Sequence, residues 1–144
     1  MAFNIEAILK DEEPDLTLED ISRALSTYVP QSTISMDDGC PPIIDKHLVV
    51  TISENDFGEN GSWSADVLLE KGEMVNQCNI EAVMEDGKDR EDKDKIENSH
   101  CRVRVYFRSD DDQKYTNTMI DLISFLESIP NAAVFDSQQC KFLN

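Results

Sequence analysis

A strict alternation of side chains between residues 102 and 108 constrains the fold of this chain most strongly. Val103, Val105 and Phe107 occupy one parity, and three arginines with Tyr106 occupy the other. Successive side chains of a β-strand point to opposite faces, so the pattern predicts a strand with one apolar and one charged face. The rest of the chain must then supply partner strands and a cover for the apolar face.

A first amphipathic helix is predicted from Leu18 to Tyr28, where apolar residues recur at helical spacing. Thr17 and Asp20 have the spacing of a capping arrangement at the helix N-terminus. Pro30 then ends the helix, because proline lacks a backbone N–H and restricts the residue before it.

A second helix is predicted from Tyr115 to Ile129, again with an apolar stripe, and Pro130 ends it. The preceding run Asp110-Asp111-Asp112 places negative charge at the predicted start of this helix. The exposed N–H groups and the helix dipole favour negative charge at that end.

Five more segments have the short alternating or β-branched patterns of strands. They are residues 3–9, 48–52, 65–69, 78–84 and 132–135. The segments 65–69 and 78–84 flank a turn near Gly72, so we expect them to pair as a hairpin. Turns are predicted around Asp37-Asp38-Gly39 and Pro41-Pro42, and a loop at 55–61.

Residues 85–97 interleave acidic and basic side chains and contain a single apolar residue, Ile96. One apolar side chain buries too little surface to offset the entropy of ordering such a segment. The sequence therefore predicts an exposed, mobile charged loop at about 85–97.

Together these elements predict a single α+β domain over residues 1–144, with an antiparallel or mixed sheet and two helices packed on one face. An elaborated split βαβ (ferredoxin-like) arrangement with an extra hairpin is the first choice of topology. The other sheet face would then be free and would show Arg102, Arg104 and Tyr106.

The charge of the chain limits its partners. Thirty Asp and Glu against 13 Lys and Arg give a formal net charge of -17. Such a surface repels nucleic acid and anionic membranes and attracts basic proteins. No long apolar run and no leader-like N-terminus is present, and the four widely spaced cysteines suit reduced thiols, so we expect a cytoplasmic protein.

Residue patterns for catalysis, cofactors and metals are weak. His100 adjoins Cys101, but the cysteines and histidines lack the local pairs of structural zinc sites, and residues 89–97 lack the glycine that an EF-hand loop needs. The five glycines form no phosphate-binding motif. The sequence predicts no enzyme, no cofactor and no metal site.

Two groups of residues are candidate contacts for a partner. The acidic turns would face a cationic protein, and the arginine face would either pair with acids on neighbouring strands or form an interface with Tyr106. The acidic candidates are Asp37, Asp38, Asp110, Asp111 and Asp112. The candidates on the strand are Arg102, Arg104 and Tyr106.

The stretch from Phe125 to Gln139 runs from a helix through a Pro130 turn to a strand that closes with an Asp-x-Gln motif at 136–138. It resembles the ending of small bacterial toxin-immunity proteins. Cys140-Lys141 departs from the glycine-containing turn expected next. The resemblance implies an acidic inhibitor that binds and neutralises a basic toxin, such as a nuclease. The alternative is a phage or mobile-element DNA mimic that blocks a host defence or DNA-binding protein.

Overall fold

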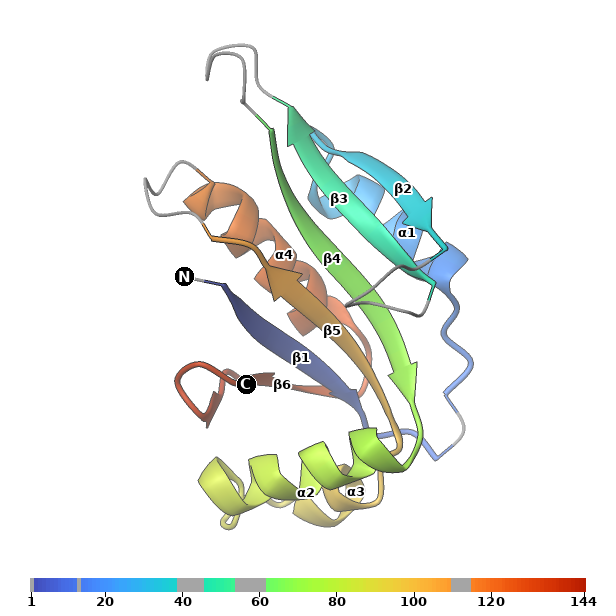
Figure 1. The fold of residues 1–144 in the computed structure, drawn as a ribbon. Helices are drawn as coiled ribbons and strands as arrows, with labels where there is room; N and C mark the ends of the chain where they lie inside the picture. Colours follow the sequence, from blue (N-terminus) through green and yellow to red (C-terminus); the bar gives the residue numbers. More distant parts are fainter. Residues whose placement is uncertain (1, 13, 39–45, 54–61, 110–114) are drawn as a thin grey trace.

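The structure, a computed structural model, describes residues 2–12, 14–38, 46–53, 62–109 and 115–144. Its strands are β1 (Phe3–Leu9), β2 (Thr33–Asp37), β3 (His47–Ser53), β4 (Ser62–Lys71), β5 (Cys101–Phe107), β6 (Ala132–Asp136) and β7 (Lys141–Phe142). Its helices are α1 (Leu18–Tyr28), α2 (Glu73–Asp86), α3 (Lys93–Glu97) and α4 (Thr116–Ser128). The strands form one sheet in the order β2-β3-β4-β5-β1-β6-β7 (Figure 1).

Every neighbouring pair of strands is antiparallel, which resolves the predicted choice between antiparallel and mixed sheets. β1 lies between β5 and β6, so those two strands are parallel to each other and are joined by α4. This is the predicted split βαβ unit. β4 continues the sheet beyond β5, and the hairpin β2–β3 extends it further. The predicted α+β class is confirmed.

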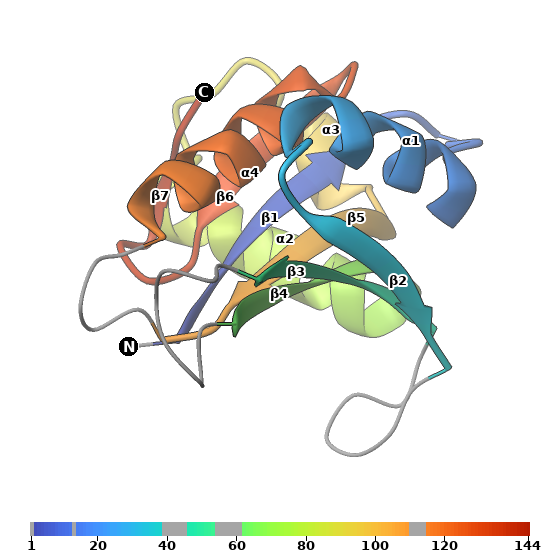
Figure 2. The same cartoon turned by 90° about the horizontal axis from the view of Figure 1, so that it is seen from above.

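Helices α1 and α4 cover one face of the sheet, as predicted (Figure 2). Their apolar stripes meet the odd-numbered apolar side chains of β1, β4 and β5, because alternate strand residues share a face. The fully buried helix residues of this core are Ile21, Leu25, Leu122, Phe125 and Leu126. We call this side the helix-covered face.

The N-terminus of α1 confirms the predicted capping arrangement. The Asp20 N–H donates to Thr17 Oγ1 at 3.2 Å, and the Thr17 N–H donates to Asp20 Oδ2 at 3.0 Å. These reciprocal bonds satisfy two of the N–H groups that have no partner within a helix. The capping box fixes where α1 starts.

The predicted strand at 78–84 is wrong, because these residues belong to α2. Gly72 does not close a hairpin; it is the N-cap of α2 and has a φ of +121°. Only glycine adopts this conformation without strain, so the chain leaves β4 and turns directly into a helix. Cys78 and Ile80 alternate in sequence, but residues two apart lie on different sides of a helix.

The predicted loop at 85–97 is also wrong, since the segment contains the end of α2 and all of α3. Ile96 is fully buried against Ile8, Val83 and Phe135 in a second, smaller apolar cluster. Asp92 binds the Arg90 guanidinium through both oxygens, at 2.8 and 2.9 Å, and the Lys10 ammonium at 2.9 Å. The charges in this segment thus fix it to β1.

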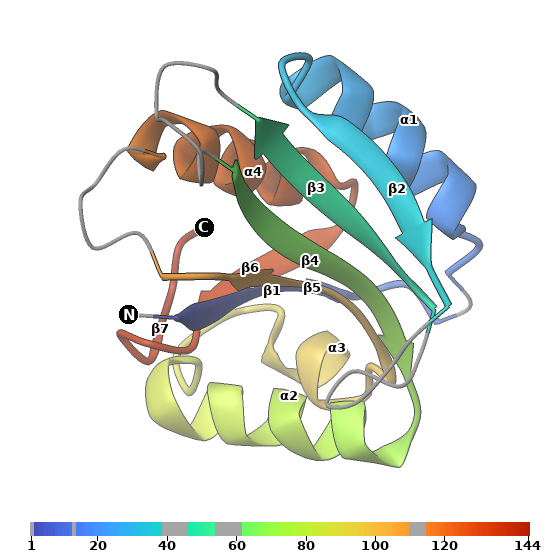
Figure 3. The same cartoon turned by 45° about the horizontal axis from the view of Figure 1, so that its top comes forward.

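Helices α2 and α3 lie on the opposite side of the sheet from α1 and α4 (Figure 3). The sheet face predicted to be free is therefore covered in part. Sequence reasoning also missed β2, which forms the sheet edge next to β3. The predicted loop at 55–61 lies outside the described residues.

Candidate partner-binding surface

A charged ladder crosses the sheet face opposite α1 and α4. Arg102 and Arg104 of β5 both donate to Glu70 of β4, with their Nε atoms 2.8 and 2.9 Å from Oε1. Arg104 Nη2 donates to Glu70 Oε2 at 2.9 Å, and the second neighbour strand, β1, brings Glu6 within 3.5 Å of Arg102. The predicted pairing of these arginines with acids on neighbouring strands is confirmed.

The pKa values of the two carboxylates in this ladder are shifted in opposite directions. Burial raises the pKa of Glu6 above its ordinary value, and the nearby charges of Arg102 and Arg104 only partly oppose this. Burial also acts to raise the pKa of Glu70, but its hydrogen bond with Arg104 and the charges of both arginines hold that pKa below its ordinary value. The ionised form of Glu70 is therefore favoured in the folded protein.

A second charged cluster lies further along the same face. The Asp66 carboxylate is buried, and Arg108 Nη2 donates to its Oδ2 at 3.0 Å. Nε2 of the buried His47 lies 3.5 Å from Asp66 Oδ1. These contacts join β3, β4 and the end of β5, so this cluster holds strands in register.

The structure separates the residues predicted to contact a partner. The side chains of Arg102 and Arg104 are 10% and 21% exposed and are bound within the sheet, with half-buried Tyr106 beside Asp66. Asp37 and Asp38 lie at the end of the edge strand β2, Asp38 exposed. Residues 110–112 lie outside the described part of the chain. A partner contact by any of these residues stays a prediction.

All five arginines of the chain bind carboxylates of the chain itself. The acids are far more numerous, and many are left over. Within the described ranges, several exposed carboxylates have no Lys or Arg ion-pair partner. They include Asp11, Glu12, Glu73, Glu81, Glu85, Asp89, Glu91 and Asp94.

The segments that carry these eight carboxylates, residues 11–12 and 73–97, lie at one end of the molecule, which we call the acidic end. The β1–α1 connection lies beside the start of α2 and the α3–β5 connection there, below the sheet in Figure 1. Residues 73–97 alone contain nine Asp and Glu against four Lys and Arg. Sequence reasoning treated 85–97 as a loop and therefore did not place its acids on a folded surface.

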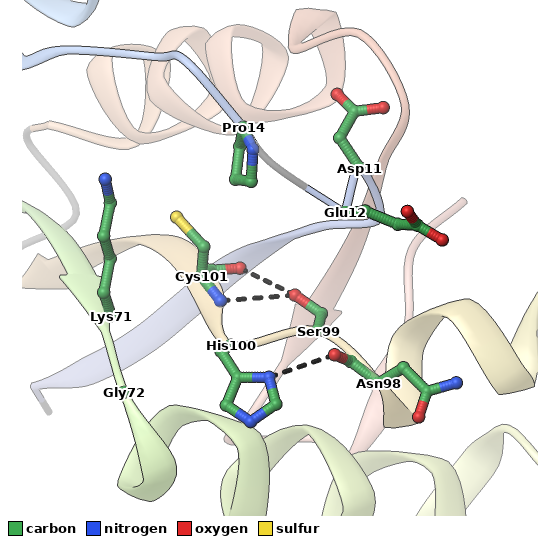
Figure 4. A pocket seen from close by; sticks show the side chains of 9 residues that line it. All are labelled: Asp11, Glu12, Pro14, Lys71, Gly72, Asn98, Ser99, His100 and Cys101. Atoms are coloured by element: carbon green, nitrogen blue, oxygen red, sulfur yellow. Dashed lines mark hydrogen bonds between the residues drawn. The ribbon is translucent and has the colours of Figure 1, made fainter.

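The acidic end contains a pocket of about 180 Å³ (Figure 4). Asp11, Glu12 and Pro14 line one side, and Lys71 and Gly72 line the other. The Ser99 hydroxyl donates to the Leu9 carbonyl at 2.6 Å and so ties the pocket floor to β1.

The pocket does not combine a base with its thiol. Cys101 and His100 are neighbours in sequence, but the Cys101 Sγ and the His100 ring point in opposite directions (Figure 4). His100 Nδ1 lies 3.0 Å from the Asn98 carbonyl oxygen. Burial raises the pKa of the Cys101 thiol, and the Lys71 charge opposes this only in part, so the protonated thiol is favoured.

The described residues contain neither a cluster of metal-ligating side chains nor a membrane-spanning helix. No three His, Cys, Asp or Glu side chains there are grouped so that they could hold a metal ion. No helix in that part of the chain combines the length and apolar character needed to cross a membrane. Cys78, Cys101 and Cys140 are free thiols.

Known proteins offer no guide to the function of this surface. No family model, curated protein or solved structure matches the chain. The resemblance to toxin-immunity proteins thus stays a prediction.

Proposed function

We propose that this protein is a non-enzymatic acidic inhibitor of the immunity type, which binds a basic protein partner in the cytoplasm and neutralises it. A toxin nuclease is the partner class that we favour. Its cationic substrate-binding surface would accept carboxylates in the places of nucleic-acid phosphates. Inhibition would then follow from occupation of that surface, with no chemistry by the inhibitor.

The observation that carries this proposal is the unequal use of the two charges. The arginines are all bound within the chain, whereas the acidic end exposes eight carboxylates without a Lys or Arg partner in the described structure. Glu73 lies 3.5 Å from His100 Nε2, and Asp11 accepts a hydrogen bond from Asn131. Carboxylates without a Lys or Arg partner can bind cations of another protein without first breaking such an ion pair. Their combined field also raises the rate of encounter with a basic protein.

The acidic end is also held in place. Asn76 Nδ2 donates to the carbonyl groups of Glu97 and Ser99 at 2.7 and 2.9 Å, which joins α2 to the chain after α3. Asp92 joins the same layer to Lys10 at the end of β1. A surface that is ordered before binding loses less entropy when a partner docks.

Affinity capture from the source organism tests the proposal. The protein is immobilised at low salt, and the bound protein is identified, titrated for stoichiometry and assayed for its own activity. We expect a basic protein that binds one to one, is released at 1 M salt, where the Debye length is about 3 Å, and loses its activity on binding. A variant with Glu81, Glu85 and Asp89 changed to Gln or Asn should capture much less of it.

Two results would count against the proposal. A captured protein whose binding is indifferent to salt would show that the -17 charge serves solubility only. Capture of a host DNA-binding protein that duplex DNA displaces, and that has no toxic activity, would favour the DNA-mimic alternative.

A further inference from the structure

The outer side of α2 combines exposed apolar and acidic side chains. Met74 and Met84 are 80% and 64% exposed, the two highest values among the large apolar residues of the described chain. Single exposed apolar residues are normal on protein surfaces. Here both of them belong to one helix, whereas the other three, Tyr28, Met36 and Ile120, lie on separate elements.

Helix geometry places the two methionines on one stripe. At about 100° per residue, positions 74, 77, 81, 84 and 85 fall within an arc of roughly 100° on one side of a helix. All five of these side chains are exposed. The buried side chains of α2, Val75, Asn79, Ala82 and Val83, occupy the other side. We call these five exposed residues the α2 stripe.

The stripe contains two acidic residues, one between the two methionines and one directly after Met84. Glu81 and Glu85 lie within the stripe, and a hollow of about 420 Å³ beside Met84 is also lined by Glu85, Asp86 and Asp89. Lys88 and Arg90 line the same hollow, so three carboxylates face two cations there. The Arg90 guanidinium is already bound to Asp92 and to the Asn144 carbonyl. Methionine side chains adapt to differently shaped partners, and the carboxylates select for positive charge.

We propose that the α2 stripe is the docking site for a basic amphipathic helix of the partner; this inference rests on the proposed function. Met74 and Met84 are about 15 Å apart along the helix axis, at 1.5 Å per residue. A partner helix lying along α2 would place its apolar stripe on both methionines. Its Lys or Arg side chains would extend past that stripe to Glu81 and Glu85.

Peptide binding measured by calorimetry tests this inference. The probes are an 18-residue amphipathic Leu/Lys peptide and a peptide of identical composition scrambled to remove its apolar stripe. The protein variants are Met74→Ser with Met84→Ser, and Ile120→Ser as the matched control on α4. Circular dichroism checks that each variant stays folded.

We expect the amphipathic peptide to bind about tenfold or more tightly than the scrambled peptide, and the double methionine variant to lose that advantage. Ile120→Ser should leave it unchanged. If both peptides bind equally and the methionine changes have no effect, the helix-docking inference is wrong, while salt-sensitive binding of both peptides would leave the proposed function intact. If neither peptide binds at low salt, both proposals fail.

Discussion

The two faces of the sheet are buried by different means. On the helix-covered face, α1 and α4 bury a continuous set of apolar side chains, whose contribution depends on area and not on direction. On the opposite face, a charged ladder adjoins the small apolar cluster under α2 and α3. Charges that leave water stabilise a fold only when their geometry and hydrogen bonds are complete. A change of side-chain shape at constant volume on the helix-covered face should therefore destabilise the protein less than the loss of one charged partner from the ladder.

The largest effect is expected on the helix-covered face. Phe125 is 1% exposed and packs edge-to-face against Tyr28 of α1, with ring centroids 6.2 Å apart, so Phe125→Ala should lower the free energy of unfolding by about 3–5 kcal/mol. Urea unfolding followed by circular dichroism measures this. Phe125→Leu, which keeps most of the volume, should cost clearly less, and an equal cost would contradict the account of this face.

A smaller loss is expected under α3. Ile96 is fully buried in the second apolar cluster, so Ile96→Ala should cost about 3 kcal/mol, although its segment was predicted to be a mobile loop. Lys95→Ala next to it removes an exposed side chain and serves as the control. If the two variants unfold at the same urea concentration, α3 does not pack as described.

Phe125 lies on a helix that the sequence pattern predicted, whereas Ile96 lies on a helix that the pattern missed. Regular periodicity identified α1, α4 and β5, because each places its apolar side chains on one side. The periodicity of α2 is hidden by its exposed Met74 and Met84, and the charges around Ile96 conceal α3. β2 escaped notice because an edge strand of Thr, Ser and Met buries little.

The candidate site could also be predicted from the sequence only in part. That Arg102 and Arg104 pair with acids could be predicted from their alternation, but the identity of Glu70 depends on the register between β4 and β5, which local sequence does not contain. The acidic end joins residues 11–12 to residues 73–97, and only the tertiary fold brings them together. The -17 charge predicted a cationic partner without predicting a place for it.

On the charged face, Glu70→Ala should lower the free energy of unfolding by about 2 kcal/mol, because it leaves two guanidinium groups without their shared acceptor. Replacing Glu6, Glu70, Arg102 and Arg104 together with leucine should cost less than Glu70→Ala alone, because no charge of the ladder is then left buried without a partner. Glu127→Ala, at an exposed position on α4, is the control. A quadruple variant less stable than the single one would show that the ladder gains more from charge pairing than it loses by desolvation.

The smallest expected effect is a change of pH dependence at Glu6. The pKa of this carboxyl is raised in the folded protein by burial, so the folded state binds more protons than the unfolded state between the two pKa values. Stability from this group therefore falls as pH rises through that window. Glu6→Gln should remove this fall, so wild type should lose stability relative to the variant as the pH rises above the ordinary glutamate pKa of 4.5. Unfolding curves at four pH values measure the difference, and parallel profiles would contradict it.

The central position of β1 in the sheet affects how the protein folds during its synthesis on the ribosome. Both of its neighbours, β5 and β6, are encoded much later, from Cys101 and Ala132 onward. At about 5–20 residues per second, β1 leaves the ribosome on the order of 5–20 seconds before its first partner strand exists. Throughout that time its apolar side chains and backbone edges are open to other chains. Chaperone dependence during synthesis should accordingly fall if the gene is circularly permuted so that β1 follows β6.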